Sequence, residues 1–275
     1  MPLTFPVWLL AFLLVACATT SSTETSSTDP SVPAPPGTSS DSTAPTSSSA
    51  TGNRSASPFE VLVFHKTTGF RHSSIQAGIE ALEALGGEHE FTVTATEDAA
   101  VFSESGLSRY DVVVFLNTTG DVLDRDQELG MEEFLEAGGG YVGVHSASDT
   151  EYDWSWYGNL VGAYFDSHPE PQHANLVVVT PQHPIVRAMP ETFERYDEWY
   201  NFQTLPGEGV TVLVAIDETS YEGGTMGELH PISWAHENLG GRSFYTAMGH
   251  TEESFDDPLF LTHLVNGILW AAGRS

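Results

Sequence analysis

Histidines stand at the ends of several short apolar runs in this sequence. His65 ends the run 60–65, His145 follows the run 141–144, and His250 comes shortly after the run 243–247. Imidazole is the usual group for proton transfer near neutral pH and the commonest metal-ligating side chain. A single histidine at a strand end is usually structural, but three that converge indicate a site. We therefore predict that His65, His145 and His250 are acid/base or metal-binding residues.

Further polar and aromatic residues follow the same runs. Asn117 comes directly after the run 111–116, and Asp149 lies four residues after His145. Sugar rings stack on aromatic side chains, while nearby acids and amides bind hydroxyl groups. Aromatic residues can also simply fill a core. From these positions we predict the following substrate-binding residues: His72, Asn117, Asp149, Trp154 and Trp156.

A divalent metal is a possible cofactor, and no other cofactor is indicated. His168 and His173 flank a Pro-Glu-Pro turn, and sets of histidine and carboxylate side chains can hold such an ion. The alternative is that both histidines form hydrogen bonds within a loop. No ordered motif such as H-E-x-x-H accompanies them.

The elements that position these residues alternate along the chain. Apolar runs separated by amphipathic stretches predict an α/β fold with a doubly wound, mostly parallel sheet. In such sheets ligands bind outside the carboxyl ends of the strands. We expect strands at 60–65, 91–96, 111–116, 141–144, 176–179, 210–216 and 243–247, and helices from Ser73 to Gly86-Gly87, at 124–137 and at 258–272.

Four longer segments carry a family resemblance. They read F-H-K-T-T-G-F-R-H-S-S from residue 64, G-V-H-S-A-S-D-T from 143, G-A-Y-F-D-S-H-P from 162, and P-I-S-W-A-H-E-N-L-G-G-R-S-F-Y-T-A-M-G-H from 231. Together they resemble the ThuA-like (trehalose utilisation) family over residues 59–272. The resemblance implies a class I glutamine amidotransferase-like (flavodoxin-like) fold and a role in carbohydrate utilisation.

The resemblance also bears on the reaction. His145 stands where the amidotransferase superfamily has its nucleophilic cysteine, and the only cysteine of the chain is Cys17, so glutamine amidotransfer is excluded. Ser146 is an alternative nucleophile, but it lacks the G-x-S-x-G context. The segment from Gly249 to Glu252 resembles the superfamily's His-x-Glu, which makes Glu252 the expected partner of His250.

An acidic and aromatic segment, residues 197–200, is also placed near the site by the resemblance. A buried carboxylate beside histidines can donate or accept a proton. We expect Glu198 to be catalytic and Tyr200 to bind substrate.

The N-terminal part of the chain has the pattern of an exported lipoprotein. Residues 1–17 contain a short apolar run that ends in Leu-Val-Ala-Cys17, which resembles a lipobox with Cys17 as the lipidation site. Residues 18–57 are rich in Ser, Thr and Pro, which is typical of a disordered tether, and the folded domain is expected at 58–275. This pattern predicts a protein anchored by lipid to the bacterial cell envelope, with the anchor as its only contact with the membrane.

The net charge restricts the partners. The chain carries 9 Lys and Arg against 38 Asp and Glu, a formal net charge of -29. Nucleic acids and anionic membrane surfaces would repel such a protein, so neither is an expected partner. The favoured hypothesis is a domain that binds or transforms a small-molecule carbohydrate, such as trehalose or another glycoside, at a histidine-rich site. The alternatives are a non-catalytic sugar-binding or scaffold lipoprotein and a metal-dependent hydrolase.

Overall fold

The computed structural model of this protein describes residues 58–275. The predicted signal peptide, the lipidation site Cys17 and the predicted tether at 18–57 lie outside the described residues.

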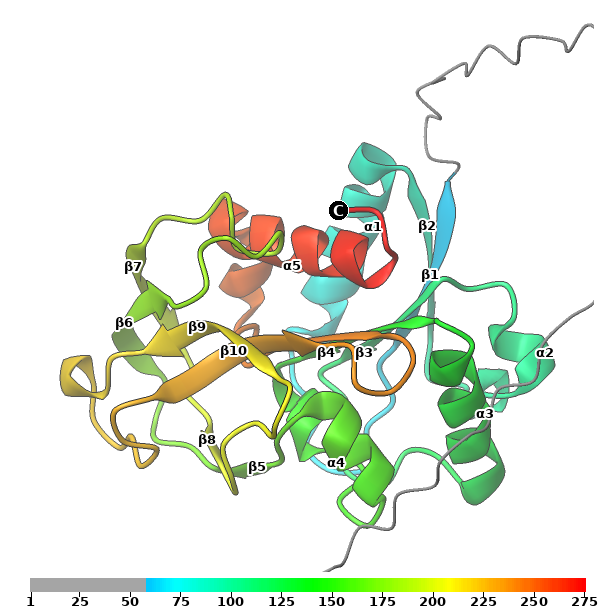
Figure 1. The fold of residues 1–275 in the computed structure, drawn as a ribbon, viewed down its shortest axis with the longest axis horizontal. Coiled ribbons are helices and arrows are strands. Elements are labelled where there is room, and N and C mark those ends of the chain that lie inside the picture. The colour runs from blue at the N-terminus through cyan, green and yellow to red at the C-terminus, as the bar shows by residue number, and fades with distance from the viewer. Residues whose placement is uncertain (1–57) are drawn as a thin grey trace, which may run out of the picture. The chain divides into compact units, whose positions relative to one another are not determined.

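A nine-stranded sheet forms the centre of the described domain, in the order β2-β1-β3-β4-β11-β10-β9-β6-β7. Strands β2, β1, β3, β4 and β11 pair in parallel. Every residue of β3 and β4 is buried, as expected for strands covered on both faces. Helices α1 and α5 lie on one face of this half, and α3 and α4 lie on the other (Figure 1). The predicted α/β fold with helices on both faces of the sheet is therefore confirmed.

The other half of the sheet is antiparallel, in contrast to the parallel units expected from the sequence. Strands β10, β9, β6 and β7 each pair antiparallel with their neighbours. Alternate residues of β6 are exposed and buried, because one side of an antiparallel sheet can face solvent. The run 176–179 is apolar throughout, although Val177 and Val179 are exposed, so the sequence does not reveal this alternation.

The two longer predicted helices near the N-terminal half differ in how they begin. Asp124 caps α3 and its carboxylate accepts hydrogen bonds from the backbone N–H groups of Asp126 and Gln127, as a capping box. In α1 the N-cap is Ser74 rather than the predicted Ser73, and its side chain forms no capping hydrogen bond. The Ser74 hydroxyl instead bonds the carbonyl of Gly249, 175 residues away.

Helix α1 also continues past the glycines at which it was expected to stop. It ends at His89, and Glu90 adopts the left-handed conformation with φ 60°. Gly86 does not end the helix. It allows close packing against Phe91, because a Cβ at this position would lie 2.6 Å from the carbonyl oxygen of Phe91.

The elements fall at the following positions. The strands are β1 Phe59–Phe64, β2 Phe91–Thr96, β3 Val112–Leu116, β4 Gly140–Val144, β5 Phe165–Ser167, β6 Gln172–Val178, β7 Thr192–Asp197, β8 Asn201–Phe202, β9 Thr211–Ile216, β10 His230–His236 and β11 Arg242–Thr246. The α-helices are α1 Ile75–His89, α2 Glu104–Leu107, α3 Arg125–Glu136, α4 Ser155–Val161 and α5 Pro258–Ala271, and short 3₁₀ helices lie at Ala99–Val101, His145–Asp149, Glu218–Ser220 and Glu252–Asp256. None of the helices within 58–275 is long and apolar enough to cross a membrane.

Candidate metal centre and its cavity

Side chains from four separate segments meet at the carboxyl end of the parallel half of the sheet. His72 lies in the loop after β1, His145 follows β4, His250 follows β11, and Glu198 follows β7. One ligand atom from each of these residues lies within 4.8 Å of the others. We call these four residues the histidine-glutamate cluster. Within the described part of the chain it is the one group of His, Cys, Asp or Glu side chains placed to surround an ion.

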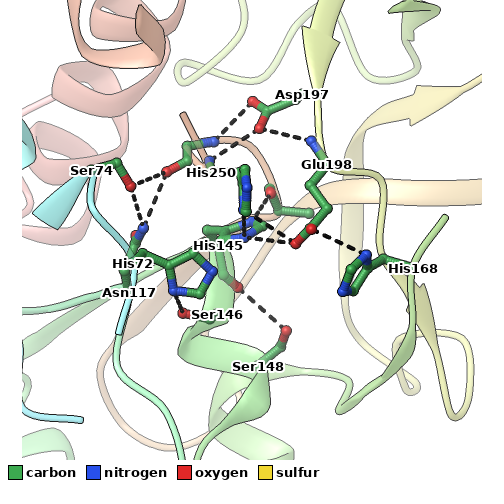
Figure 2. Close-up of polar contacts among 12 residues, drawn as sticks. His72, Ser74, Asn117, His145, Ser146, Ser148, His168, Asp197, Glu198 and His250 are labelled. Carbon is green, nitrogen blue, oxygen red and sulfur yellow. Dashed lines mark hydrogen bonds and ion pairs between the residues drawn. The ribbon is translucent and has the colours of Figure 1, made fainter. Parts of the chain in front are cut away.

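Three atoms of the cluster form a tight triangle (Figure 2). His145 Nε2 and His250 Nδ1 are 3.2 Å apart, and Glu198 Oε2 is 3.4 Å from the first and 3.2 Å from the second. Ligands bound tetrahedrally at 2.0–2.1 Å from an ion are separated by about 3.3 Å. The spacing of these three atoms therefore matches one face of a metal coordination shell.

The backbone holds the ring of His145 in a single orientation. Its Nδ1 lies 2.7 Å from the carbonyl oxygen of Ala247, so Nδ1 carries the proton and donates it. In the neutral ring Nε2 then presents its lone pair to the triangle. A metal-ligating histidine usually binds the ion through one ring nitrogen and donates the N–H of the other to a carbonyl or carboxylate. His145 has φ 49°, a left-handed conformation that turns its side chain sharply out of β4.

Glu198 and His250 influence each other's charge. Burial acts to raise the pKa of Glu198, but the two imidazoles beside it, those of His145 and His250, outweigh it and hold that pKa well below its usual range. Burial acts to lower the pKa of His250, and the bond to Glu198 together with the charge of Asp197 raises it overall. Glu198 is therefore an anion, the form in which a carboxyl group binds a cation.

His72 remains neutral. Burial, with the neighbouring imidazoles of His145 and His250, lowers its pKa to about 2. Its Nδ1 lies 3.3 Å from the hydroxyl oxygen of Ser146. A buried neutral imidazole keeps a lone pair available for an ion.

A cavity of about 210 Å³ opens beside the cluster. One part of its wall is aromatic and the other is polar. The lining consists of Phe70, His72, Asp149, Phe165, His168, Glu198, Tyr200 and His250. A mixed wall of this kind can hold a small polar molecule against the cluster.

The family follows from the sequence over almost all of this domain. Residues 60–271 match the ThuA family, described as trehalose utilisation. The chain belongs to the ThuA family. No curated protein sequence gives a significant match to it.

Several solved structures share this fold. A ThuA-like protein from Bacteroides uniformis is 24% identical with a TM-score of 0.69, over 80% of this chain and 94% of that chain. A ThuA-like protein from Parabacteroides merdae is 19% identical with a TM-score of 0.66, over 78% and 90% of the two chains. A β-galactosidase from Bacillus circulans sp. alkalophilus is 14% identical with a TM-score of 0.51, over 78% of this chain and 31% of that enzyme. At these identities the likeness is one of fold.

Several predicted site residues of this ThuA domain are brought together. His145, His250, Glu198 and His72 form the cluster, and Asp149, Tyr200 and His168 line the cavity. The ring centroid of Tyr200 lies 4.3 Å from that of His145. His168 Nδ1 lies 3.1 Å from Glu198 Oε1, so His168 touches the carboxylate oxygen that faces away from the triangle.

His65 lies apart from the cluster. Its Nδ1 is 3.1 Å from Glu97, which also pairs with Arg71 at 2.7 Å. Burial lowers the pKa of His65. Its assignment as a catalytic residue stays a prediction that the cluster does not support.

His173 and His168 contact different carboxylates. His173 lies 3.0 Å from Glu194 and its side chain is 67% exposed. Glu252 is exposed as well, and Glu198 takes the place of partner to His250 that the His-x-Glu pattern had assigned to Glu252.

The predicted sugar-binding residues Trp154, Trp156 and Asn117 do not line the cavity. Trp154 and Trp156 stack on each other with ring centroids 5.0 Å apart, and Trp154 donates a hydrogen bond to Glu132. Asn117 is fully buried and donates to the hydroxyl of Ser74 and to the carbonyl of Gly249. Asn117 thus supports the turn that carries His250.

Three residues that take part in the site, Phe70, Phe165 and Asp197, are not among the site residues predicted from the sequence. Phe70 and Phe165 belong to the aromatic wall of the cavity. The carboxylate of Asp197 accepts hydrogen bonds from the backbone N–H groups of Gly249 and His250. Both phenylalanines lie inside the segments that carry the family resemblance, which was the available signal. Asp197 stands directly before Glu198, but nothing in the sequence distinguishes its role from that of its neighbour.

Proposed function

We propose that this ThuA domain binds a divalent transition metal through the histidine-glutamate cluster and acts on a sugar held in the adjoining cavity. The observation that supports the proposal most directly is the triangle formed by His145 Nε2, His250 Nδ1 and Glu198 Oε2, with sides of 3.2–3.4 Å. Two nitrogen lone pairs and a carboxylate oxygen repel one another at this distance unless a proton or a cation lies between them.

The ligand types favour a particular class of ion. Three imidazoles and one carboxylate suit Zn²⁺, Fe²⁺ or Ni²⁺, whereas Mg²⁺ and Ca²⁺ prefer sites made of oxygen atoms. The ring of His72 is neutral, so it need not lose a proton before it binds an ion, and the carbonyl of Ala247 fixes the orientation of His145. His168 holds the second oxygen of Glu198.

The cavity suits one sugar ring. Phe70, Phe165 and Tyr200 offer faces on which the C–H groups of a sugar can stack, and Asp149 and His168 offer polar atoms to its hydroxyl groups. The Tyr152 hydroxyl donates to Asp149 Oδ1 at 2.6 Å and fixes the direction of that carboxylate. Burial raises the pKa of Asp149, so this carboxyl group is suited to take up and release a proton at a sugar hydroxyl.

A metal at the cluster would supply Lewis acidity toward a sugar oxygen or activate a water molecule. The reaction class is accordingly metal-assisted proton transfer or hydrolysis on a glycoside or an oxidised sugar. Ser146 does not supply a nucleophile of the serine-hydrolase type, because it is buried and its one ring partner, His72, faces the other histidines rather than an orienting acid.

We also propose that the protein is exported and anchored to the bacterial cell envelope through Cys17. The lipobox-like sequence that ends at Cys17 and the Ser-, Thr- and Pro-rich composition of residues 18–57 support this proposal. The net charge of -29 supports a small-molecule carbohydrate rather than nucleic acid as the partner.

The test is metal analysis of the purified full-length chain, followed by titration with Zn²⁺ and then with trehalose and glucose. We expect about one tightly held metal ion per chain, and sugar binding that disappears when the metal is removed with a chelator. A chain that holds no metal after exposure to Zn²⁺, Fe²⁺ and Ni²⁺ would overturn the proposal. Sugar binding without turnover would favour the alternative of a non-catalytic sugar-binding protein.

A further inference from the structure

Asp197 is a fully buried carboxylate at the end of β7, and it is not a member of the histidine-glutamate cluster. Its Oδ1 accepts hydrogen bonds of 3.0 Å from the backbone N–H groups of Glu198 and His250. Its Oδ2 accepts one of 3.0 Å from the N–H of Gly249. One side chain therefore holds the backbone of two cluster residues that lie 52 positions apart in the sequence.

The same carboxylate is held in place from its other side. Arg195 Nε lies 3.0 Å from Asp197 Oδ2, and the Ser254 hydroxyl donates to that oxygen at 3.4 Å. Arg195 is buried, bonds Asp257 through its Nη1, and lies over the ring of Phe260. The buried negative charge is thereby neutralised, and its position is set by β7 and by the residues at the start of α5.

We propose that Asp197 is the positioning residue of the metal site: it fixes Glu198 and His250 relative to each other so that their side chains meet on one ion. The inference rests on the proposed metal function. It goes beyond that function because it assigns the geometry of the cluster to a residue that touches neither ion nor substrate. The loop at 248–251 belongs to no helix or strand, so its backbone needs such an external acceptor.

Asp197→Asn is the decisive substitution, because an amide cannot replace this carboxylate in either orientation. If the amide nitrogen takes the place of Oδ1, it faces the N–H groups of Glu198 and His250. If it takes the place of Oδ2, it faces the N–H of Gly249 and the Nε–H of Arg195. Donors then oppose donors in both cases.

Asp124→Asn provides the matched control. Asp124 also accepts two backbone N–H groups, but through Oδ1 alone, so an asparagine can replace it without a clash. It caps α3, which contributes no residue to the cluster.

The experiment measures Zn²⁺ affinity and backbone amide exchange in the wild-type chain, D197N and D124N. We expect D197N to lose about 10- to 100-fold in Zn²⁺ affinity, the usual effect of removing an outer-shell partner, and D124N to match the wild type. A purely structural ion pair would lower the melting temperature of D197N without this loss, and an unchanged Zn²⁺ affinity overturns the inference.

Amide exchange of the metal-free wild-type chain gives a test that does not depend on how D197N folds. The amides of Gly249 and His250 should exchange as slowly as those of β11, because they bond a buried acceptor. Exchange as fast as in exposed loops overturns the inference. If the wild type binds no metal but these amides are protected, and lose protection in D197N, the metal proposal fails while the positioning role of Asp197 stands.

Discussion

His145 Nε2 and His250 Nδ1 lie 3.2 Å apart although 105 positions separate the two residues in the sequence. The contact follows from the sheet. Strands β4 and β11 are parallel neighbours in which Val144 pairs with Thr246, so the loops that follow them leave the sheet at the same edge. The pairing of β4 with β11 therefore brings together two histidines that no local motif links.

A bound metal should stabilise this domain by mass action. At a free concentration 100 times its dissociation constant, an ion that binds only the folded state stabilises it by about 2.7 kcal/mol. For a domain of this size that corresponds to a rise in melting temperature of roughly 5–10 °C. The measurement is a thermal melt with Zn²⁺ and again after chelation, and a melting temperature indifferent to both would contradict the prediction.

Substitution of His145 and of His65, which both follow strands, should affect the stabilisation by Zn²⁺ differently. His145→Gln removes a member of the triangle and should abolish the stabilisation by Zn²⁺. His65→Gln should leave it unchanged, because His65 contacts Glu97 and not the cluster. Thermal melts of both variants with and without Zn²⁺ make the comparison, and equal losses in the two variants would show that His65 belongs to the site.

Substitution of an aromatic residue of the cavity should weaken sugar binding more than substitution of an aromatic residue of α4. Phe70 lines the cavity and is 67% exposed, so a sugar can stack on it. Phe70→Ala should weaken sugar binding by about 1 kcal/mol, roughly fivefold in Kd. Trp156→Ala is the control, since Trp156 packs on Trp154 away from the cavity. Calorimetric titration with the sugar that binds the wild type decides, and a larger loss in the Trp156 variant would contradict the proposed sugar position.

Glu151 should make the stability depend on pH. It is buried and accepts hydrogen bonds from the backbone of Val122 and Leu123, and burial raises its pKa from 4.5 to about 7. The folded state therefore binds this proton more tightly than the unfolded state. The resulting stability is complete below pH 4.5 and is lost as pH rises through about 7, a decrease of about 1–3 kcal/mol in the free energy of unfolding.

Glu151→Gln isolates this contribution, because its amide oxygen can still accept both backbone hydrogen bonds. Urea unfolding from pH 5 to pH 8 should show a smaller decrease in E151Q than in the wild type. Glu83→Gln changes an exposed glutamate of α1 and serves as the control. If E151Q and E83Q follow the same pH profile as the wild type, the buried carboxyl group is not the cause.

The sequence by itself determined the strands and helices of the parallel half and the loops that carry its chemistry. Continuous apolar runs such as β3 and β4, and caps such as Asp124, are local signals of burial and helix start. Because parallel strands end at one edge of a sheet, the position of a histidine after such a run was enough to place His145 and His250 there. The same reasoning included His65, since the sequence does not tell in which direction a side chain points after its strand.

Only the tertiary structure decided which residues meet. Glu198 enters the cluster from β7, a strand of the antiparallel half that was not predicted, and it replaces Glu252 as the partner of His250. Asp197 acts through the backbone of Gly249 and His250, a contact that depends on how β7 packs beside the loop after β11. Hydrophobic periodicity reports whether a residue is buried, but the distance between two buried side chains depends on strand order and loop path, which are properties of the whole fold.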